Sequence, residues 1–137
     1  MRLLIICIFL IVNLGFGIIN NPNQEKLDGK WIPVRQEFAG SSLPSSSFEK
    51  QTLVINDSMY VVTAESVDKG TLKYSDGKMD IFGKDGINSG KHFTAIYKLD
   101  KEQLTICYNL KGDVYPASYE TKGHPMFFLS VFKKSDQ

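Results

Sequence analysis

The chain has 137 residues, of which 42% are hydrophobic and 23% are charged, and its formal net charge at pH 7 is +1. This length predicts a single domain with enough apolar residues for an ordinary core. A nearly neutral chain offers no electrostatic basis for binding nucleic acid or an anionic membrane surface, so we predict neither.

Residues 1–17 have the layout of a signal peptide. Arg2 supplies one positive charge, and an almost wholly apolar run follows over residues 3–14. This run is shorter than the ~20 residues that a membrane-spanning helix needs. The small-x-small pattern Gly15-Phe16-Gly17 predicts cleavage between Gly17 and Ile18.

Cleavage would export the protein to the periplasm or the medium and leave no stable membrane span. The alternative is an uncleaved N-terminal anchor extended through Ile18 and Ile19. Export also removes Arg2, which leaves 15 of the 16 basic residues against 15 acidic ones. Because Cys7 is removed as well, Cys107 is the single remaining cysteine and no internal disulfide is expected.

After a short polar segment at 18–26, the chain consists of short strands joined by turns. Eight segments alternate or are rich in β-branched and aromatic residues: 31–38, 52–56, 59–64, 70–75, 78–82, 92–99, 103–108 and 126–134. Asp57-Ser58 separates two of these segments as a tight hairpin, and Asp76-Gly77 is a hairpin signal because both of its positions accept positive φ.

The acidic residues lie mostly in the predicted turns, where they serve backbone geometry: Asp57, Asp68, Asp76, Asp85, Asp100 and Asp113. No long helix is expected, and residues 44–50 suffice for one short helical turn. The pattern predicts an all-β fold at 27–134, a single antiparallel up-and-down β-barrel of about eight strands, with 135–137 as a C-terminal tail.

The first strand opens with Gly29-x-Trp31, which resembles the opening motif of the lipocalins. This resemblance implies that Trp31 closes one end of the barrel. It also implies that a basic residue of the last strand, Lys133 or Lys134, packs across the indole ring.

The mature chain also resembles a narrower family, the uncharacterised small lipocalin-like domains of planctomycete-type bacteria. The matching stretches are Leu27-x-Gly29-x-Trp31, Gly40 with Leu43-Pro44, Gly70-Thr71-Leu72-Lys73, Asp85-Gly86, Ile96-Tyr97-x-Leu99-Asp100 and Leu104-x-Ile106-Cys107-Tyr108. Where this family carries Arg-Pro, the chain has Tyr115-Pro116. The resemblance implies the fold and export, and it implies no activity.

Residues able to carry catalysis or bind a metal are few. The mature chain has His92, His124 and Cys107, without the ligand spacing of a zinc site, and no nucleophile with an assignable base. We therefore predict no metal, no cofactor and no enzymatic activity. Cys107 has two interpretations, a small buried hydrophobe or a reactive thiol.

Aromatic and small residues on two strands suggest a ligand site. Phe93, Ala95 and Tyr97 share one face of their strand, and Phe127 and Leu129 share a face of the last strand. We predict that these residues line a barrel interior that holds a small apolar or amphipathic molecule.

The alternative is a barrel filled by its own side chains. Such a protein would be an interaction or inhibitor module that acts through loops 39–48 and 114–123. Tyr115 and Tyr119 are then the contact candidates.

Overall fold

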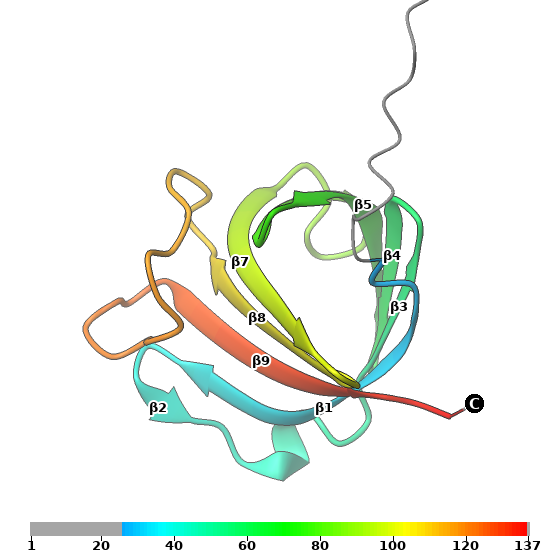
Figure 1. Cartoon of the computed structure of the whole chain (residues 1–137), viewed down its shortest axis with the longest axis horizontal. Helices are drawn as coiled ribbons and strands as arrows, with labels where there is room; N and C mark the ends of the chain where they lie inside the picture. Colours follow the sequence, from blue (N-terminus) through cyan, green and yellow to red (C-terminus); the bar gives the residue numbers. More distant parts are fainter. Residues whose placement is uncertain (1–25, 137) are drawn as a thin grey trace, which may run out of the picture.

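A computed structural model describes residues 26–136, which fold into a closed antiparallel β-barrel (Figure 1). The strands are β1 (Gly29–Phe38), β2 (Ser41–Ser42), β3 (Thr52–Asn56), β4 (Met59–Thr63), β5 (Val67–Ser75), β6 (Lys78–Asp85), β7 (His92–Asp100), β8 (Gln103–Asn109) and β9 (Phe127–Lys134). The helical part is a single 3₁₀ turn, η1 (Ser45–Ser47). In residues 26–136 no helix has the length and hydrophobicity to cross a membrane.

The predicted all-β barrel is confirmed. Eight strands pair in the order β1-β3-β4-β5-β6-β7-β8-β9, and β9 pairs back with β1 to close the ring. The two-residue β2 pairs with the end of β1 outside this ring. The predicted signal peptide, its cleavage site and residues 18–25 lie outside the described part of the chain.

Turn chemistry sets the order of the strands. The β3–β4 hairpin has Asp57 at a φ of 55°, and the β5–β6 hairpin has Asp76 and Gly77 at 52° and 79°. These are left-handed conformations that aspartate and glycine accept more readily than most residues, which is why the two turns are tight. Each turn therefore places consecutive strands beside each other, as an up-and-down barrel requires.

Alternation along each strand divides the residues between the interior and the outer surface. Leu53 and Ile55 of β3, Leu72 of β5, and Met79 and Ile81 of β6 are buried members of one interior core. In β1 the alternation shifts at a register irregularity between Pro33 and Arg35. Trp31 and Gln36 are therefore both buried, although five positions apart.

The connection at residues 110–126 covers part of the barrel from outside, and it lies beyond β8 and β9 in Figure 1. Thr121 of this connection is buried, accepts a hydrogen bond from the Gly40 amide and donates one to Glu37. This covering layer explains why Cys107 and Leu129, which are paired across β8 and β9, are buried.

Candidate ligand-binding cavity

Trp31 closes one end of the barrel. Its indole N–H donates a hydrogen bond of 2.8 Å to the carbonyl oxygen of Leu27, and both side chains are buried. The ammonium group of Lys134 lies 5.6 Å from the centre of the Trp31 ring, so Lys134, rather than Lys133, takes the position across the indole. Gly29 leaves room for this side chain, since a Cβ there would lie 2.8 Å from Lys134 Cε.

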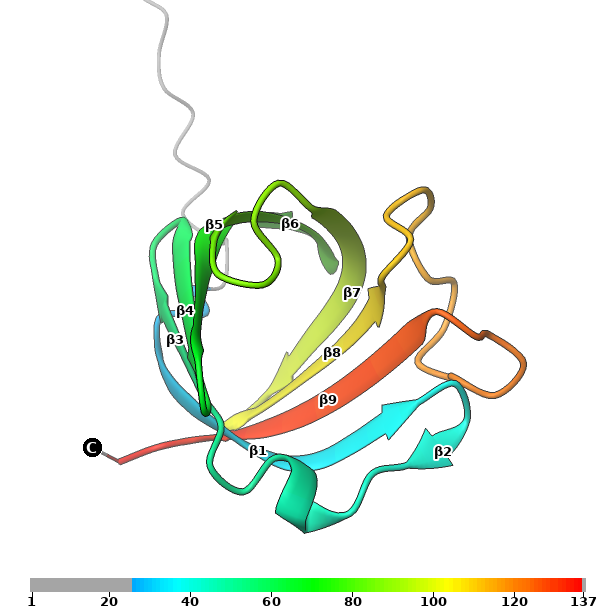
Figure 2. The ribbon, with the colours of Figure 1, turned by 180° about the vertical axis from the view of Figure 1, so that it is seen from behind.

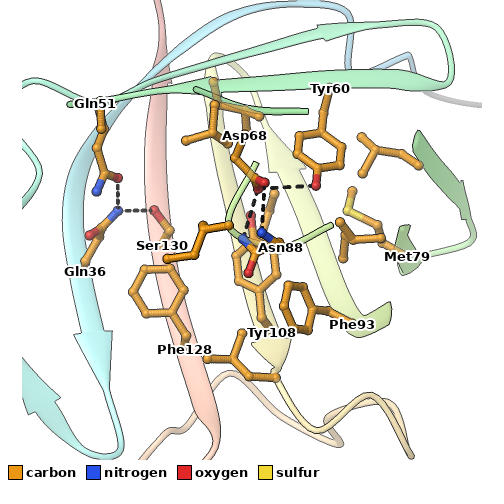
Figure 3. A pocket seen from close by; sticks show the side chains of 18 of the residues that line it. Gln36, Gln51, Tyr60, Asp68, Met79, Asn88, Phe93, Tyr108, Phe128 and Ser130 are labelled. Atoms are coloured by element: carbon orange, nitrogen blue, oxygen red, sulfur yellow. Dashed lines mark hydrogen bonds between the residues drawn. The ribbon is translucent and has the colours of Figure 1, made fainter. Parts of the chain in front are cut away.

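The rest of the interior is not filled. A cavity of about 570 Å³ lies within the barrel, a volume in the range of small-molecule sites. Most of its wall is apolar and comes from inward positions of seven strands: Leu53, Ile55, Val62, Leu72, Met79, Ile81, Phe93, Ile106, Phe128 and Phe132. Figure 3 shows Met79, Phe93 and Phe128 of this set around the central space.

A polar group, which we call the Asp68 corner, is set into this apolar wall. It consists of Asp68, Tyr60 and Asn88. The Asp68 carboxylate accepts hydrogen bonds from the Asn88 side-chain amide at 2.9 Å, the Asn88 backbone amide at 3.3 Å and the Tyr60 hydroxyl at 3.4 Å (Figure 3). Burial, with the negative charge of Asp68 beside it, raises the pKa of Tyr60 to about 12.

A second polar group lies on the β1 and β9 side of the cavity. The side-chain amide of Gln36 donates to Gln51 at 3.0 Å and to the hydroxyl of Ser130 at 3.2 Å (Figure 3). Beyond Trp31, β1 has no backbone pairing with β3, so the Gln36–Gln51 bond ties these two parts of the wall together. All three side chains line the cavity.

Aromatic side chains complete the wall near the Asp68 corner. Tyr108 and Phe128 have ring centres 5.7 Å apart, and both line the cavity together with Phe93. Burial raises the pKa of Tyr108 far above its ordinary value, and the neighbouring Tyr60 adds to this. Within residues 26–136 the Tyr108 hydroxyl makes no hydrogen bond, so a polar group of a bound molecule would find a partner there.

The loop between β6 and β7 partly covers the open end (Figure 2). Gly83 makes two backbone hydrogen bonds with this loop, to Lys91 and from Gly90. A Cβ at Gly83 would lie 1.8 Å from the carbonyl oxygen of Asn88, so only glycine permits this approach. Ile87 lines the cavity yet is 78% exposed, which puts an apolar side chain at the entrance.

The structure separates the predicted ligand residues of β7. Phe93 lines the cavity. Ala95 and Tyr97 share its inward face but belong to the packed core, where Tyr97 meets Tyr74 edge-on with ring centres 5.7 Å apart. Along β7 the cavity therefore extends to Phe93 and not to Ala95 or Tyr97, which belong with Trp31 to the buried core cluster.

The predicted residues of β9 have the opposite orientation. Phe128, Ser130 and Phe132 line the cavity, whereas Phe127 and Leu129 do not. Leu129 is buried under the outer layer beside Cys107, and the ring of Phe127 stacks on His124 with centres 4.3 Å apart. Both faces of β9 are therefore apolar, and alternation alone does not identify the inner one.

The predicted contact tyrosines lie on the outer surface of the barrel. The Tyr115 hydroxyl donates to Asp80 at 2.5 Å, and Lys78 lies over the Tyr115 ring. Lys98 lies over the Tyr119 ring at 4.4 Å. Both rings therefore attach residues 110–126 to the barrel wall.

The sequence reasoning missed the polar residues of the cavity. Asp68 was expected in a turn because the strand was predicted to begin at Gly70, but β5 begins at Val67 and Asp68 points inward. The sequence does contain a signal for the inward position of Asp68, because the alternation Asp68-x-Gly70-x-Leu72 puts Asp68 and Leu72 on the same face of a strand. Asn88 lies between the strand segments predicted at 78–82 and 92–99, and nothing in the local sequence indicates that this connection folds back on Gly83.

The residues considered for metal binding or thiol chemistry lie elsewhere. His92 contacts Asp80 on the outer surface at 2.7 Å, and in the described residues no three metal-binding side chains come together. Cys107 is fully buried, and burial together with the charge of Glu37 raises the pKa of its thiol to about 11. The geometry favours the interpretation of Cys107 as a small buried hydrophobe.

Comparisons with known proteins give a likeness of fold. No model of a known protein family matches the sequence, and no curated protein matches it. Among solved structures, the chain is similar to an uncharacterised protein from Bacteroides eggerthii, with 11% sequence identity and a TM-score of 0.53. The match covers 80% of this chain and all of the other. This similarity supports the barrel architecture alone.

Proposed function

We propose that the protein is a lipocalin-like binding protein that holds one small apolar or amphipathic molecule inside its barrel. The observation that carries this proposal is the cavity of about 570 Å³ with a mainly apolar wall. Eight-stranded barrels are either filled by side chains or hold one small ligand, and this one has the space for a ligand. Binding, not catalysis, is the proposed role.

Export is part of the same proposal. The signal-peptide pattern of residues 1–17 supports a protein that works in the periplasm or outside the cell. The position of Lys134 across Trp31, next to Gly29, agrees with the arrangement that the lipocalin resemblance implies.

The alternative, an interaction or inhibitor module, was based on a filled barrel. A cavity of this volume does not fit that premise. The rings of Tyr115 and Tyr119 also contact the protein's own Lys78 and Lys98, which gives them a role within the fold. We therefore place the ligand-binding proposal first.

The test uses protein purified from cells that express the full chain. N-phenyl-1-naphthylamine, an uncharged probe at pH 7 that fluoresces in apolar surroundings, should bind with one site per molecule. Val62→Trp fills cavity space from β4 and should reduce binding at least about tenfold. Val61→Trp, on the other face of the same strand, is the control and should bind normally.

Native mass spectrometry of the same preparation supplies an independent result. A retained small-molecule adduct that Val62→Trp loses would support the proposal. Absence of both adduct and probe binding, or equal loss in the two tryptophan variants, would contradict it. A protein partner captured in place of a small molecule would favour the interaction module.

A further inference from the structure

The cavity wall carries two charged side chains, and they occupy different positions. Asp68 projects inward from β5 and is only 9% exposed. Lys91 is exposed and belongs to the loop that covers the open end. A molecule inside the barrel therefore meets the carboxylate of Asp68 in a desolvated setting, and meets Lys91 at the rim beside water.

The Asp68 carboxylate is held by neutral groups. Its three hydrogen bonds come from Tyr60 and from the backbone and side-chain amides of Asn88. Among the described residues it has no ion-pair partner, since the salt bridges of residues 26–136 involve Glu37, Asp80 and Asp113. The negative charge is therefore solvated by dipoles and not cancelled by a protein cation.

Two of these hydrogen bonds, at 3.3 and 3.4 Å, are longer than the usual 2.7–3.2 Å. An ionised carboxylate has about four acceptor positions, so Asp68 can accept a further, shorter bond from a strong donor. Charge-assisted donors form the shorter and stronger bonds of this kind.

Aromatic side chains in the wall of the same cavity also favour a cation. Phe93, Tyr108 and Phe128 line the same cavity, and aromatic faces attract ammonium groups. The Tyr108 hydroxyl, which makes no hydrogen bond in residues 26–136, offers a second oxygen acceptor. Beyond this region the wall is apolar, with Met79, Ile81 and Ile106.

We propose that the cavity selects apolar molecules that carry a protonated amine, with the ammonium group donating hydrogen bonds to Asp68 and the apolar body against Met79, Ile81 and Ile106. This inference rests on the proposed binding function and specifies its ligand class. A carboxylate of the same shape is disfavoured, because its charge would lie against that of Asp68.

Three ligands of matched length separate the possibilities: decylamine, decanol and decanoate, titrated calorimetrically at pH 7 below their micellar concentrations. Decylamine should bind about tenfold more tightly than decanol, as expected for a buried charge-assisted hydrogen bond, and decanoate should bind most weakly. Equal affinities for decylamine and decanol would overturn the amine selectivity. Tightest binding of decanoate would also overturn it and indicate recognition by Lys91.

Two substitutions test the role of the charge. Asp68→Asn keeps the side-chain shape and should bring the affinity for decylamine to within about twofold of that for decanol. Asp85→Asn, at an exposed position on β6, changes the net charge equally and should keep the tenfold preference. Loss of the preference in both variants would contradict a specific site at Asp68.

Asn88→Ala separates the charge of Asp68 from its structural role in holding the covering loop. This variant removes one neutral donor and keeps the carboxylate, so the preference for decylamine over decanol should rise. A fall to the Asp68→Asn value would show that loop structure sets the selectivity and would overturn the proposal. Binding of N-phenyl-1-naphthylamine without any amine preference would refute this inference alone, whereas absence of all binding would refute the proposed function as well.

Discussion

Lys134 lies across the face of Trp31 at the closed end of the barrel, with its Nζ atom 5.6 Å from the ring centre. The pair joins the start of β1 to the end of β9, the two strands whose pairing closes the ring. Trp31 is itself 1% exposed and fixed by its bond to Leu27, so the lysine packs on an ordered surface.

We expect Lys134→Ala to lower the free energy of unfolding by about 0.5–1 kcal/mol, because it removes a solvent-exposed cation–π contact. Lys133→Ala is the matched control and should change it by less than about 0.5 kcal/mol, since Lys133 is exposed and has no such contact among the described residues. Urea unfolding followed by fluorescence of Trp31, the single tryptophan of the chain, measures both. Equal effects of the two substitutions would rule out a specific Lys134–Trp31 contribution.

Alanine substitutions at Gly83 and Gly90 compare the destabilisation caused by side-chain crowding with that caused by backbone strain. A Cβ at Gly83 would meet the Asn88 backbone at 1.8 Å, whereas one at Gly90 meets nothing within 4 Å but sits at a φ of 81°. Gly83→Ala should therefore destabilise the barrel by about 2–3 kcal/mol through overpacking, and Gly90→Ala by about 1 kcal/mol through φ alone.

Urea unfolding of both glycine variants gives the stabilities, and probe titration gives the effect on the cavity. Because the Gly83 substitution displaces Asn88 from Asp68, it should also change binding of N-phenyl-1-naphthylamine. A Gly83→Ala protein with native stability and native binding would mean that the loop does not pack on β6 as described.

The barrel could be predicted because each of its local signals acts within a few residues. Asp76-Gly77 fixes a hairpin by backbone conformation, and the runs on either side alternate as half-buried strands do. Predicting this hairpin therefore needs no information from distant parts of the chain. Closure of the ring then follows from strand number and order.

The cavity residues were harder to predict because their positions depend on contacts between distant segments. Phe127 and Phe128 are chemically alike, and only the outer layer formed by residues 110–126 decides which face of β9 is inside. Asp68 resembles the aspartates of the turns, and its inward position depends on where β5 begins. Local sequence therefore predicted the scaffold, whereas the lining depended on long-range packing.

Cys107 should be unreactive in the folded protein. It is fully buried, and burial raises the pKa of its thiol to about 11, so very little thiolate exists at pH 8. We expect labelling by 5,5′-dithiobis(2-nitrobenzoate) at pH 8 to be at least about a hundredfold slower than in 6 M guanidinium. Rapid stoichiometric labelling of the native protein would instead support the reactive-thiol interpretation.

The same burial predicts a loss of stability in alkali. Folding raises the pKa of Cys107 from 9.0 to about 11 and that of Tyr60 from 10.0 to about 12, in both cases chiefly through desolvation. Below pH 9 both groups are protonated in the folded and the unfolded chain, so their effect on stability is constant. As the pH rises past 9, these groups lose their protons in the unfolded chain before they do so in the folded protein, so the free energy of unfolding falls. The fall ends once the pH exceeds the folded-state pKa values.

We therefore expect the free energy of unfolding to fall by about 2–4 kcal/mol between pH 8 and pH 11, since a pKa difference of one corresponds to ~1.4 kcal/mol. Cys107→Ala removes one of the buried groups whose pKa is raised in the folded protein, so its stability should decline less steeply over pH 9–11. Urea unfolding at pH 8, 9, 10 and 11 measures these slopes. Parallel slopes for Cys107→Ala and the unmodified protein would show that Cys107 titrates equally in the folded and the unfolded chain. That result would contradict a desolvated thiol at this position.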